Sequence, residues 1–107
     1  MQRVTLVRYA AKPERADENE ALSRAVFAEL RAKAPADVFY ALFREGDDFV
    51  HLFVNFAADD SEAVTELPTF KAYAQGVSER CVAPPQPLRL GMALLEAYGV
   101  GAVMAEA

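Results

Sequence analysis

The residues best suited to chemistry lie in one eight-residue stretch, 49–56, which reads Phe-Val-His-Leu-Phe-Val-Asn-Phe. It holds the only histidine of the chain, His51, together with an asparagine, Asn55. A neutral imidazole beside apolar side chains can accept a proton from an acidic phenol near neutral pH. An amide held where water is excluded can stabilise a developing oxyanion. His51 and Asn55 are therefore candidate catalytic residues. Each also has a structural interpretation, the histidine as a buried, hydrogen-bonded group and the asparagine as the cap of a turn.

The same stretch predicts a central strand, because it is rich in aromatic and β-branched side chains. With a period of two residues, one face carries His51 and Asn55 together with two phenylalanines. The other face is uniformly apolar and carries Val50, Leu52, Val54 and Phe56. Neither face is suited to water, so both must be covered. We expect a ligand site on the histidine face and a second apolar layer on the other.

Other reactive side chains have more ordinary interpretations. Tyr9, Tyr40 and Tyr73 could each offer a hydroxyl to a ligand, but an aromatic ring with a solvated tip is typical of the edge of a core. Cys81 falls on the apolar stripe of an expected helix, which favours a buried, inert thiol over a nucleophile.

Two arginines, Arg8 and Arg89, fall in terminal strands that are expected to be neighbours. Facing inward in a dimer interface, they could bind an anionic substrate, or they could pair with Glu45 or Glu96. Pairing is the interpretation that we favour from the sequence.

Length and composition set wider limits. A chain of 107 residues with 53% hydrophobic and 25% charged residues predicts one globular domain. A net charge of -5 provides no basic patch, which argues against nucleic acid and anionic membranes as partners. The N-terminus does not resemble a signal peptide and no apolar run is long enough to span a membrane, so we expect a cytoplasmic protein.

No cofactor is expected. One cysteine and one histidine cannot build a metal site rich in nitrogen and sulfur ligands, and there is no glycine-rich loop for phosphate groups. We therefore expect the purified protein to contain no tightly bound metal, haem or flavin.

The first half of the chain predicts a strand and a helix. Residues 3–11 alternate as a strand, and Pro13 ends it. Asp17 and Glu20 resemble a capping box at the start of a helix that Pro35 ends. The apolar stripe of this helix is expected at Leu22, Ala25, Val26 and Leu30.

The second half predicts a hairpin, a helix and a strand. Residues 38–45 form a second strand that the short polar connection 46–48 joins to the strand 49–56. Pro68 suits the first turn of a helix that runs to about Arg80, although Gly76 lowers its helix propensity. We interpret residues 88–98 as a last strand, because the β-α-β-β-α order needs one to pair with the first strand.

These elements predict an α+β fold of the ferredoxin-like, split β-α-β type. The expected order is β-α-β-β-α-β, with a four-stranded antiparallel sheet and two helices on one face. One domain spans the whole chain, with a core at about 3–98 and a tail at 99–107 that is either frayed or laid across a partner.

Three stretches resemble the antibiotic biosynthesis monooxygenase family of dimeric α/β barrels. They are residues 7–20, Val-Arg-Tyr-Ala-Ala-Lys-Pro-Glu-Arg-Ala-Asp-Glu-Asn-Glu; residues 65–73, Thr-Glu-Leu-Pro-Thr-Phe-Lys-Ala-Tyr; and residues 79–85, Glu-Arg-Cys-Val-Ala-Pro-Pro. The resemblance implies a homodimer whose two sheets pack through their helix-free faces. It also implies a cavity between the sheet and the helices, where members oxidise aromatic, polyketide-like molecules with dioxygen and without a cofactor.

The resemblance also bears on the site. Some members degrade haem with an asparagine, a tryptophan and a histidine, where this chain has Val7, Asn55 and Ala74 and no tryptophan at all, so haem degradation is not expected. His51 and Asn55 should face the cavity and contact one bicyclic substrate. The expected substrate-binding residues are Tyr9, Phe53, Phe70 and Tyr73.

Two functions remain open from the sequence. One is a cofactor-independent monooxygenase, and the other is a non-enzymatic dimeric binding or stress-response protein whose cavity its own phenylalanines fill. A cavity below a few hundred Å³ would favour the second.

Overall fold

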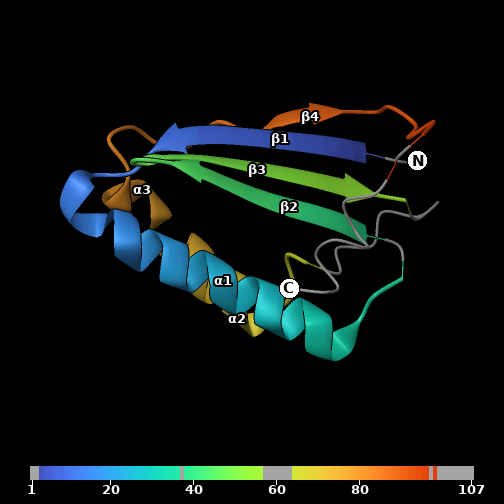
Figure 1. Cartoon of the computed structure of the whole chain (residues 1–107), viewed down its shortest axis with the longest axis horizontal. Coiled ribbons are helices and arrows are strands. Elements are labelled where there is room, and N and C mark those ends of the chain that lie inside the picture. The colour runs from blue at the N-terminus through green and yellow to red at the C-terminus, as the bar shows by residue number, and fades with distance from the viewer. Residues whose placement is uncertain (1–2, 37, 57–63, 97, 99–107) are drawn as a thin grey trace.

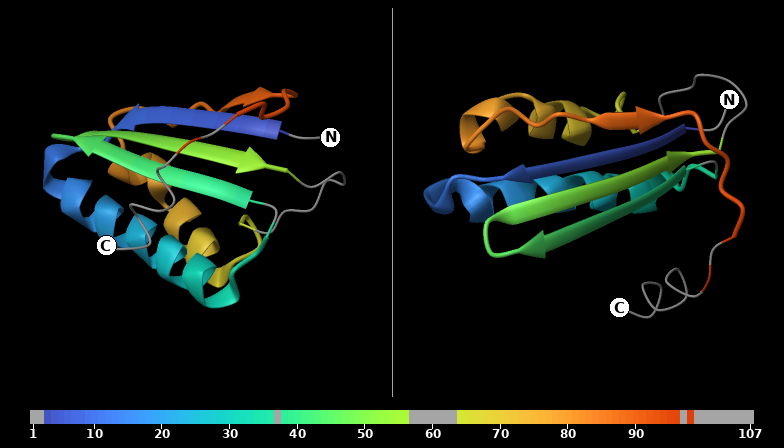
Figure 2. Two further views of the ribbon diagram at one scale, coloured as in Figure 1. Left: turned by 45° about the vertical axis from the view of Figure 1, so that its right-hand side comes forward. Right: turned by 90° about the horizontal axis from the view of Figure 1, so that it is seen from above.

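The structure, a computed structural model, describes residues 3–36, 38–56, 64–96 and 98 (Figure 1). Its elements in chain order are β1 Arg3–Ala10, the 3-10 turn η1 Pro13–Arg15, α1 Ala16–Lys33, β2 Val38–Glu45, β3 Asp48–Asn55, α2 Pro68–Ala74, α3 Val77–Arg80 and β4 Leu88–Leu90. The strands form one sheet in the order β2-β3-β1-β4, and every neighbouring pair is antiparallel. The helices lie together on one face of this sheet (Figures 1 and 2). The predicted α+β, ferredoxin-like arrangement is confirmed.

The strand register decides which side chains face the helices. In the β1–β3 ladder, Val7 lies opposite His51 and Arg3 lies opposite Asn55. In the β2–β3 ladder, Tyr40 lies opposite Phe53. Since paired residues project to the same face of a sheet, the histidine face of β3 continues across β1 and β2 on the helix side.

The space between sheet and helices holds two buried clusters. One contains Tyr9, Ala11, Ala16, Phe49 and Cys81, and the other contains Val26, Val64, Leu67 and Tyr73. Of the predicted stripe on α1, Val26 is buried and Leu22 and Leu30 pack against the second cluster, but Ala25 is exposed and its prediction is wrong. The buried face of α1 instead continues toward its N-terminus through Asn19 and Ser23.

The capping box predicted at the start of α1 does not form. The helix follows directly on η1, and its N-cap residue, Arg15, makes no side-chain capping bond. The carboxylates of Asp17 and Glu20 instead lie 3.0 and 2.8 Å from Nη1 of Arg44, on β2. Because α1 begins at Ala16, Asp17 already has a place inside the first helical turn and cannot serve as the N-cap residue.

The helix predicted over 68–80 is interrupted. α2 ends at Ala74 and α3 begins at Val77. Between them Gly76 has a φ of 80°, in the left-handed region, which no residue of a continuous right-handed helix adopts. After the break, α3 carries Arg80, which is buried.

α1 also holds the start of α2 in place. Oε1 of Glu29 accepts hydrogen bonds from the backbone N–H and the hydroxyl of Thr69, at 3.1 and 2.6 Å. A carboxylate at a helix N-terminus satisfies a backbone N–H group that has no partner within the helix. This contact fixes α2, and with it Tyr73, relative to α1.

The last strand is shorter than predicted. β4 covers only Leu88–Leu90 of the expected 88–98, although it pairs antiparallel with β1 as the topology required. The described residues after Leu90 have no regular secondary structure. The predicted tail, 99–107, lies outside the described residues.

The face of the sheet opposite the helices is apolar. By the strand register it carries Leu6, Phe43, Leu88 and Leu90, whose exposed fractions are 39%, 57%, 53% and 38%. We call these four residues the helix-free patch. In the described part of the chain, no helix combines the length and the hydrophobicity that crossing a membrane requires.

Candidate active site

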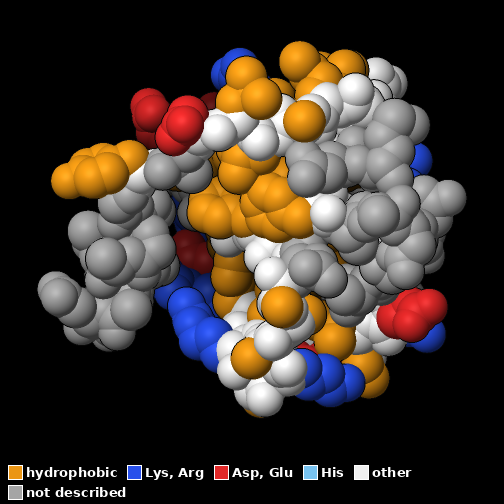
Figure 3. All heavy atoms as spheres, turned by 90° about the vertical axis from the view of Figure 1, so that its right-hand side faces the viewer, with side chains coloured by type: hydrophobic (Ala, Val, Ile, Leu, Met, Phe, Trp, Pro, Cys, Tyr) orange, Lys and Arg blue, Asp and Glu red, His pale blue; other side chains and the backbone are white. Residues whose placement is uncertain are grey.

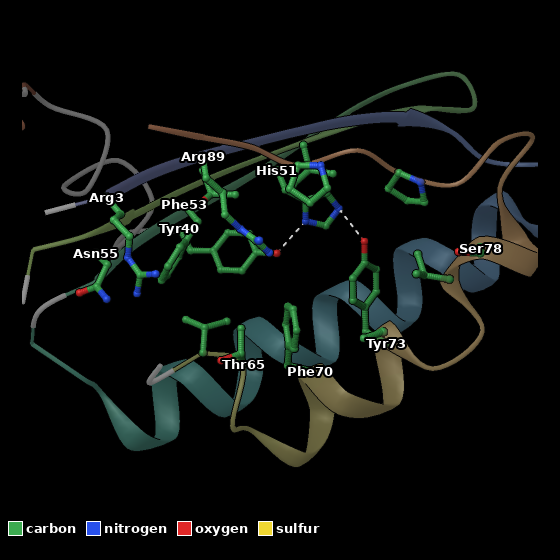
Figure 4. A pocket seen from close by; sticks show the side chains of 17 residues that line it. Arg3, Tyr40, His51, Phe53, Asn55, Thr65, Phe70, Tyr73, Ser78 and Arg89 are labelled. Atoms are coloured by element: carbon green, nitrogen blue, oxygen red, sulfur yellow. Dashed lines mark hydrogen bonds between the residues drawn. The ribbon is translucent and has the colours of Figure 1, made fainter. Parts of the chain in front are cut away.

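A cavity of about 420 Å³ lies between the helix side of the sheet and α2. Ligand pockets in proteins usually have volumes of about 300 to 1,000 Å³, so this one is large enough for a small molecule. Its apolar walls come from Val7, Phe53, Val64, Phe70 and Val77, and its polar groups include Tyr40, His51, Asn55, Tyr73, Arg3 and Arg89 (Figure 4). Hydrophobic side chains also gather in the middle of the face seen in Figure 3. The phenylalanines of β3 therefore do not fill the cavity between sheet and helices, and a small ligand has room there.

His51 projects from β3 into this space and is only 4% exposed. Both of its ring nitrogens are hydrogen-bonded to tyrosines. Nδ1 lies 2.7 Å from the hydroxyl of Tyr40 (Figure 4). Nε2 lies 2.8 Å from the hydroxyl of Tyr9. The hydroxyl of Tyr73 is 3.3 Å from the same Nε2. The imidazole thus links tyrosines from three different elements.

The hydroxyl of Tyr9 is held from behind by a second set of contacts. It lies 2.8 Å from the Tyr73 hydroxyl and accepts a hydrogen bond of 2.8 Å from Nδ2 of Asn19, on α1. The other amide atom of Asn19, Oδ1, accepts a hydrogen bond of 3.1 Å from Nε of Arg80. Because a guanidinium can only donate, this contact fixes which way the asparagine amide points.

The fixed amide leaves two proton arrangements for the rest of the chain. Tyr9 accepts from Asn19 in both, so its single hydroxyl proton goes either to His51 or to Tyr73. In the first arrangement Tyr73 donates to Tyr9, Tyr9 donates to Nε2, and Nδ1–H donates to Tyr40. In the second, Tyr40 donates to Nδ1, Nε2–H donates to Tyr9, and Tyr9 donates to Tyr73. All groups are neutral in both, and the two differ by the shift of one proton along each bond.

Burial keeps these groups uncharged. Desolvation lowers the pKa of the His51 imidazole to about 4. Burial likewise raises the pKa of the hydroxyls of Tyr9, Tyr40 and Tyr73, because a buried phenolate is poorly solvated. Around pH 7 the site therefore contains a neutral imidazole between neutral phenols.

The low pKa of His51 predicts a loss of stability in mild acid. The pKa falls from 6.5 in the unfolded chain to about 4 in the folded chain, so the unfolded chain binds more protons between these values. The contribution of the neutral imidazole to the free energy of unfolding should therefore be complete above pH 6.5. The free energy of unfolding should decrease by about 3 kcal/mol as the pH falls to 4. Urea unfolding of wild type and His51→Gln, compared at pH 7 and pH 4.5, measures this term. Equal acid sensitivity of the two proteins would contradict it.

Asn55 does not share a binding position with His51. Four residue positions separate the two, which at 3.3 to 3.4 Å per residue is about 13 Å along the strand, and Phe53 lies between them. This distance is too long for both side chains to contact one bicyclic ring system, so that expectation is wrong. Asn55 is 2% exposed and lines the cavity near Arg3, at the end away from His51 (Figure 4).

The other predicted site residues fall into two groups. Phe53, Phe70 and Tyr73 line the cavity, and their rings can contact a ligand. Tyr9 is not among the lining residues; it is 6% exposed and lies behind His51. The hydroxyls of Tyr9 and Tyr73 both lie beside Nε2 of His51, but Tyr9 positions the imidazole and does not line the cavity.

Three members of this arrangement were not predicted as site residues: Asn19, Tyr40 and Arg80. Asn19 and Ser23 continue the stripe of Val26 and Leu30 at spacings of three and four residues, so they are polar residues on a buried face. Arg80 continues the stripe of Tyr73 and Val77 in the same way. Polar residues at stripe positions are thus a usable sequence signal, because burial obliges them to find partners.

Arg80 itself is 2% exposed. Besides Asn19, it donates to the backbone carbonyls of Tyr73 and Gln75, and its guanidinium lies over the Tyr73 ring, 5.4 Å from the centroid. These contacts fix Tyr73 from the helix side. Within the described residues, no group of three or more His, Cys, Asp or Glu side chains could hold a metal ion.

The two arginines of the terminal strands, Arg8 and Arg89, face opposite sides of the sheet. Arg8 lies opposite Val50 and so faces away from the helices, whereas Arg89 lines the cavity. Neither forms an ion pair with any residue that the structure describes, so the favoured pairing with Glu45 or Glu96 is not found.

Comparisons with known proteins place the fold. No family profile matches the sequence, and no curated protein matches it. Among solved structures, a protein of Caulobacter crescentus CB15, provisionally named an antibiotic biosynthesis monooxygenase, has a TM-score of 0.71 at 18% identity, over 87% of this chain and 91% of its own. A protein of Nitrosomonas europaea with the same provisional name has a TM-score of 0.69 at 16% identity, over 85% and 89%. The Rv0793 protein of Mycobacterium tuberculosis has a TM-score of 0.69 at 20% identity, over 92% and 100%. The chain has the fold of the antibiotic biosynthesis monooxygenases.

Proposed function

We propose that this protein is a cofactor-independent monooxygenase that acts on an aromatic, polyketide-like small molecule. The observation that supports it best is the Tyr40–His51–Tyr9–Tyr73 hydrogen-bond chain, because both of its end residues line the cavity. A hydrogen-bond chain with two neutral proton arrangements can move a proton between two points of a ligand site without creating a buried charge.

The proposed reaction is the oxidation of a phenol that has a free ring position para to its hydroxyl. Loss of the hydroxyl proton gives a phenolate whose para carbon carries negative charge and reacts with dioxygen. The resulting peroxide takes up a proton, loses the ring C–H proton and breaks its O–O bond. One oxygen atom remains on the ring as a quinone carbonyl, and the other leaves as water. For 1,5-dihydroxynaphthalene, the products are 5-hydroxy-1,4-naphthoquinone and water, so no external reductant is needed.

The hydrogen-bond chain can serve both proton transfers of this reaction. These transfers accompany the addition of dioxygen, so that the forming peroxide accepts a proton as the substrate hydroxyl loses one. Starting from the second arrangement, the substrate hydroxyl gives its proton to Tyr40, and the Tyr40 proton moves to Nδ1 of His51. The Nε2 proton moves to Tyr9, and the Tyr9 proton moves to Tyr73, whose own proton goes to the peroxide. His51 thus accepts one proton and releases another without becoming an imidazolium ion. With a pKa of about 4, the imidazolium form would cost about 4 kcal/mol at pH 7.

The remaining site residues position the substrate in this proposal. The rings of Phe53 and Phe70 hold the aromatic system between sheet and helix. Asn55 binds a substrate oxygen at the end of the cavity away from His51. The distance along β3 is too long for Asn55 to reach the substrate hydroxyl that gives its proton to Tyr40. The catalytic role first expected for Asn55 becomes a role in orientation.

We also propose a homodimer that forms through the helix-free patch. The patch is the apolar surface that the strand register leaves on the open face of the sheet, and apolar patches on folded proteins commonly mark interaction surfaces. The arrangement agrees with the sequence resemblance, which implied packing through helix-free faces.

Tyrosine variants test the proton chain. Tyr40→Phe and Tyr73→Phe each remove one hydroxyl and keep the ring, and each should lower oxygen uptake with 1,5-dihydroxynaphthalene by about 10² or more, because general acid–base groups contribute 10² to 10⁴. Tyr98→Phe makes the same chemical change at a residue that is 98% exposed and should leave the rate unchanged. Rates are measured with an oxygen electrode above the uncatalysed background.

The same assay judges the alternative, a binding protein without turnover. That alternative is favoured by the fact that every ring nitrogen of His51 already has a partner, which a purely structural histidine would also show. Equal rates in wild type, Tyr40→Phe and Tyr73→Phe would support it over the proposed reaction.

A further inference from the structure

Two arginines, Arg3 and Arg89, supply positive charge to the cavity. Among the lining residues that the structure describes, none is an aspartate or glutamate. The described part of the cavity is therefore positively charged, whereas the chain as a whole carries a net charge of -5. Ion pairs form elsewhere on the surface, for example between Arg44 and Glu20, but neither cavity arginine forms one with a described residue.

The strand register places these two arginines close together. Arg89 lies opposite Thr5 in the β1–β4 ladder, and Arg3 is two residues from Thr5 on the same face of β1. They are therefore diagonal neighbours, whose backbone positions lie about 7 to 8 Å apart. Like charges at this distance repel each other, and an anion between them would relieve the repulsion.

The arginines and the proton chain occupy different parts of one cavity. Arg89 comes from β4, two strands from His51, which corresponds to about 10 Å across the sheet. Arg3 lies opposite Asn55, about 13 Å along the strand direction from the His51 position. Figure 4 shows Arg3 and Asn55 at the end of the cavity away from Tyr73, and Arg89 extending from the sheet between these ends. Phe53 and Phe70 lie between these ends, where an aromatic ring system would lie.

We propose that the substrate is a hydroxylated aromatic carboxylic acid whose carboxylate binds between Arg3 and Arg89. Guanidinium groups pair with carboxylates through paired, charge-assisted hydrogen bonds, and two guanidiniums can each take one carboxylate oxygen. A carboxylate also carries a single charge and is less costly to transfer into a largely apolar cavity than a doubly charged phosphate. This assignment rests on the proposed function for the orientation of the hydroxyl, which the arginine anchor places at Tyr40 and Tyr73.

A matched pair of ligands tests the anchor. The probes are 6-hydroxy-2-naphthoic acid and its methyl ester, which share the ring and the hydroxyl and differ in the charge. Dissociation constants are measured by the naphthalene fluorescence under nitrogen, so that no turnover occurs. The acid should bind to wild type about tenfold more tightly than the ester, which corresponds to a charge-assisted hydrogen bond at a partly exposed site. Added salt should weaken binding of the acid but not of the ester.

Arginine variants assign the effect to residues. Arg3→Gln and Arg89→Gln should each reduce the preference for the acid by about threefold or more, and the double variant should bind both ligands equally. Arg31→Gln removes the same charge from the exposed face of α1 and should keep the full preference. Circular dichroism confirms that each variant is folded.

The proposal is wrong if the acid binds no more tightly than the ester, if neither probe binds, or if the double variant keeps the preference. These outcomes are separate from those of the oxygenase assay. A preference for the acid without any oxygen uptake would retain the anchor and reject the reaction. Uptake with 1,5-dihydroxynaphthalene but no preference for the acid would retain the reaction and reject the anchor.

Discussion

Replacing His51 with alanine is expected to lower the rate of oxygen uptake with 1,5-dihydroxynaphthalene by about 10² to 10⁴. Among the residues that the structure describes, only the imidazole links Tyr40 on one side to Tyr9 and Tyr73 on the other, so its removal interrupts the proton path through them. Free imidazole added to the His51→Ala protein should restore part of the rate, because it can occupy the space that the side chain leaves. A protein that had merely lost stability would not respond in this way.

The pH dependence gives a second readout of the same residue. The wild-type rate should fall as the pH decreases through about 4, because a protonated imidazole has no nitrogen that can accept a proton. The residual rate of His51→Ala should lack this lower limb. If the variant keeps the wild-type rate, or if both proteins show the same lower limb while folded, His51 has a structural role only.

Leu6→Glu is expected to convert the protein from a dimer to a monomer. Leu6 lies in the central strand β1, opposite Leu52 and Leu88, on the face that we propose as the interface. In a two-fold symmetric dimer the substitution occurs twice, and each glutamate would be buried without a partner. A cost of several kcal/mol raises the dissociation constant by about 10³-fold or more.

The position also allows a clean control. Leu6 is 39% exposed within the single chain, so a glutamate there can reach water once the partner has left. Val54, on the same face, is 5% exposed already, and a charge there would destabilise the chain itself. Ala28→Glu adds the same charge on the exposed side of α1 and should leave the dimer intact. Sedimentation at micromolar concentration decides, and a monomeric wild type or a Leu6→Glu dimer would exclude this interface.

The sequence predicted the fold because its strongest signals are local. The alternation in 49–56 placed His51 and Asn55 on the helix side of β3, and the turn at Gly46 placed β2 beside it. The need for a fourth strand beside β1 was a topological argument, and Leu88–Leu90 fulfil it. The length of that strand was not predictable, because the alternation of leucine and methionine continues past the last residue that pairs with β1.

The errors arose where contacts distant in sequence prevailed over local preference. Asp17 and Glu20 have the spacing of a cap, but Arg44, more than twenty residues away, binds both. One helix was predicted from Pro68 to about Arg80, whereas the backbone at Gly76 leaves the helical region between Ala74 and Val77.

The candidate site was predicted in part for the same reason. Strand parity placed His51 on the helix side of the sheet, because this signal depends only on neighbouring residues, and the family resemblance supplied Tyr73. The partners of His51 depend on register and helix packing. Tyr40 becomes its neighbour through the β2–β3 ladder, and Asn19 and Arg80 become partners only because α1 and α3 meet beneath Tyr9.

The most direct test of the central claim is the stoichiometry of oxygen uptake by the wild-type protein with 1,5-dihydroxynaphthalene, in the presence of a metal chelator and without added cofactor. We expect one dioxygen consumed for each 5-hydroxy-1,4-naphthoquinone formed, at a rate above the uncatalysed background, with one oxygen atom of the product derived from labelled dioxygen. Uptake no faster than background, by a protein whose binding of the naphthalene is shown by fluorescence, would contradict the proposed function.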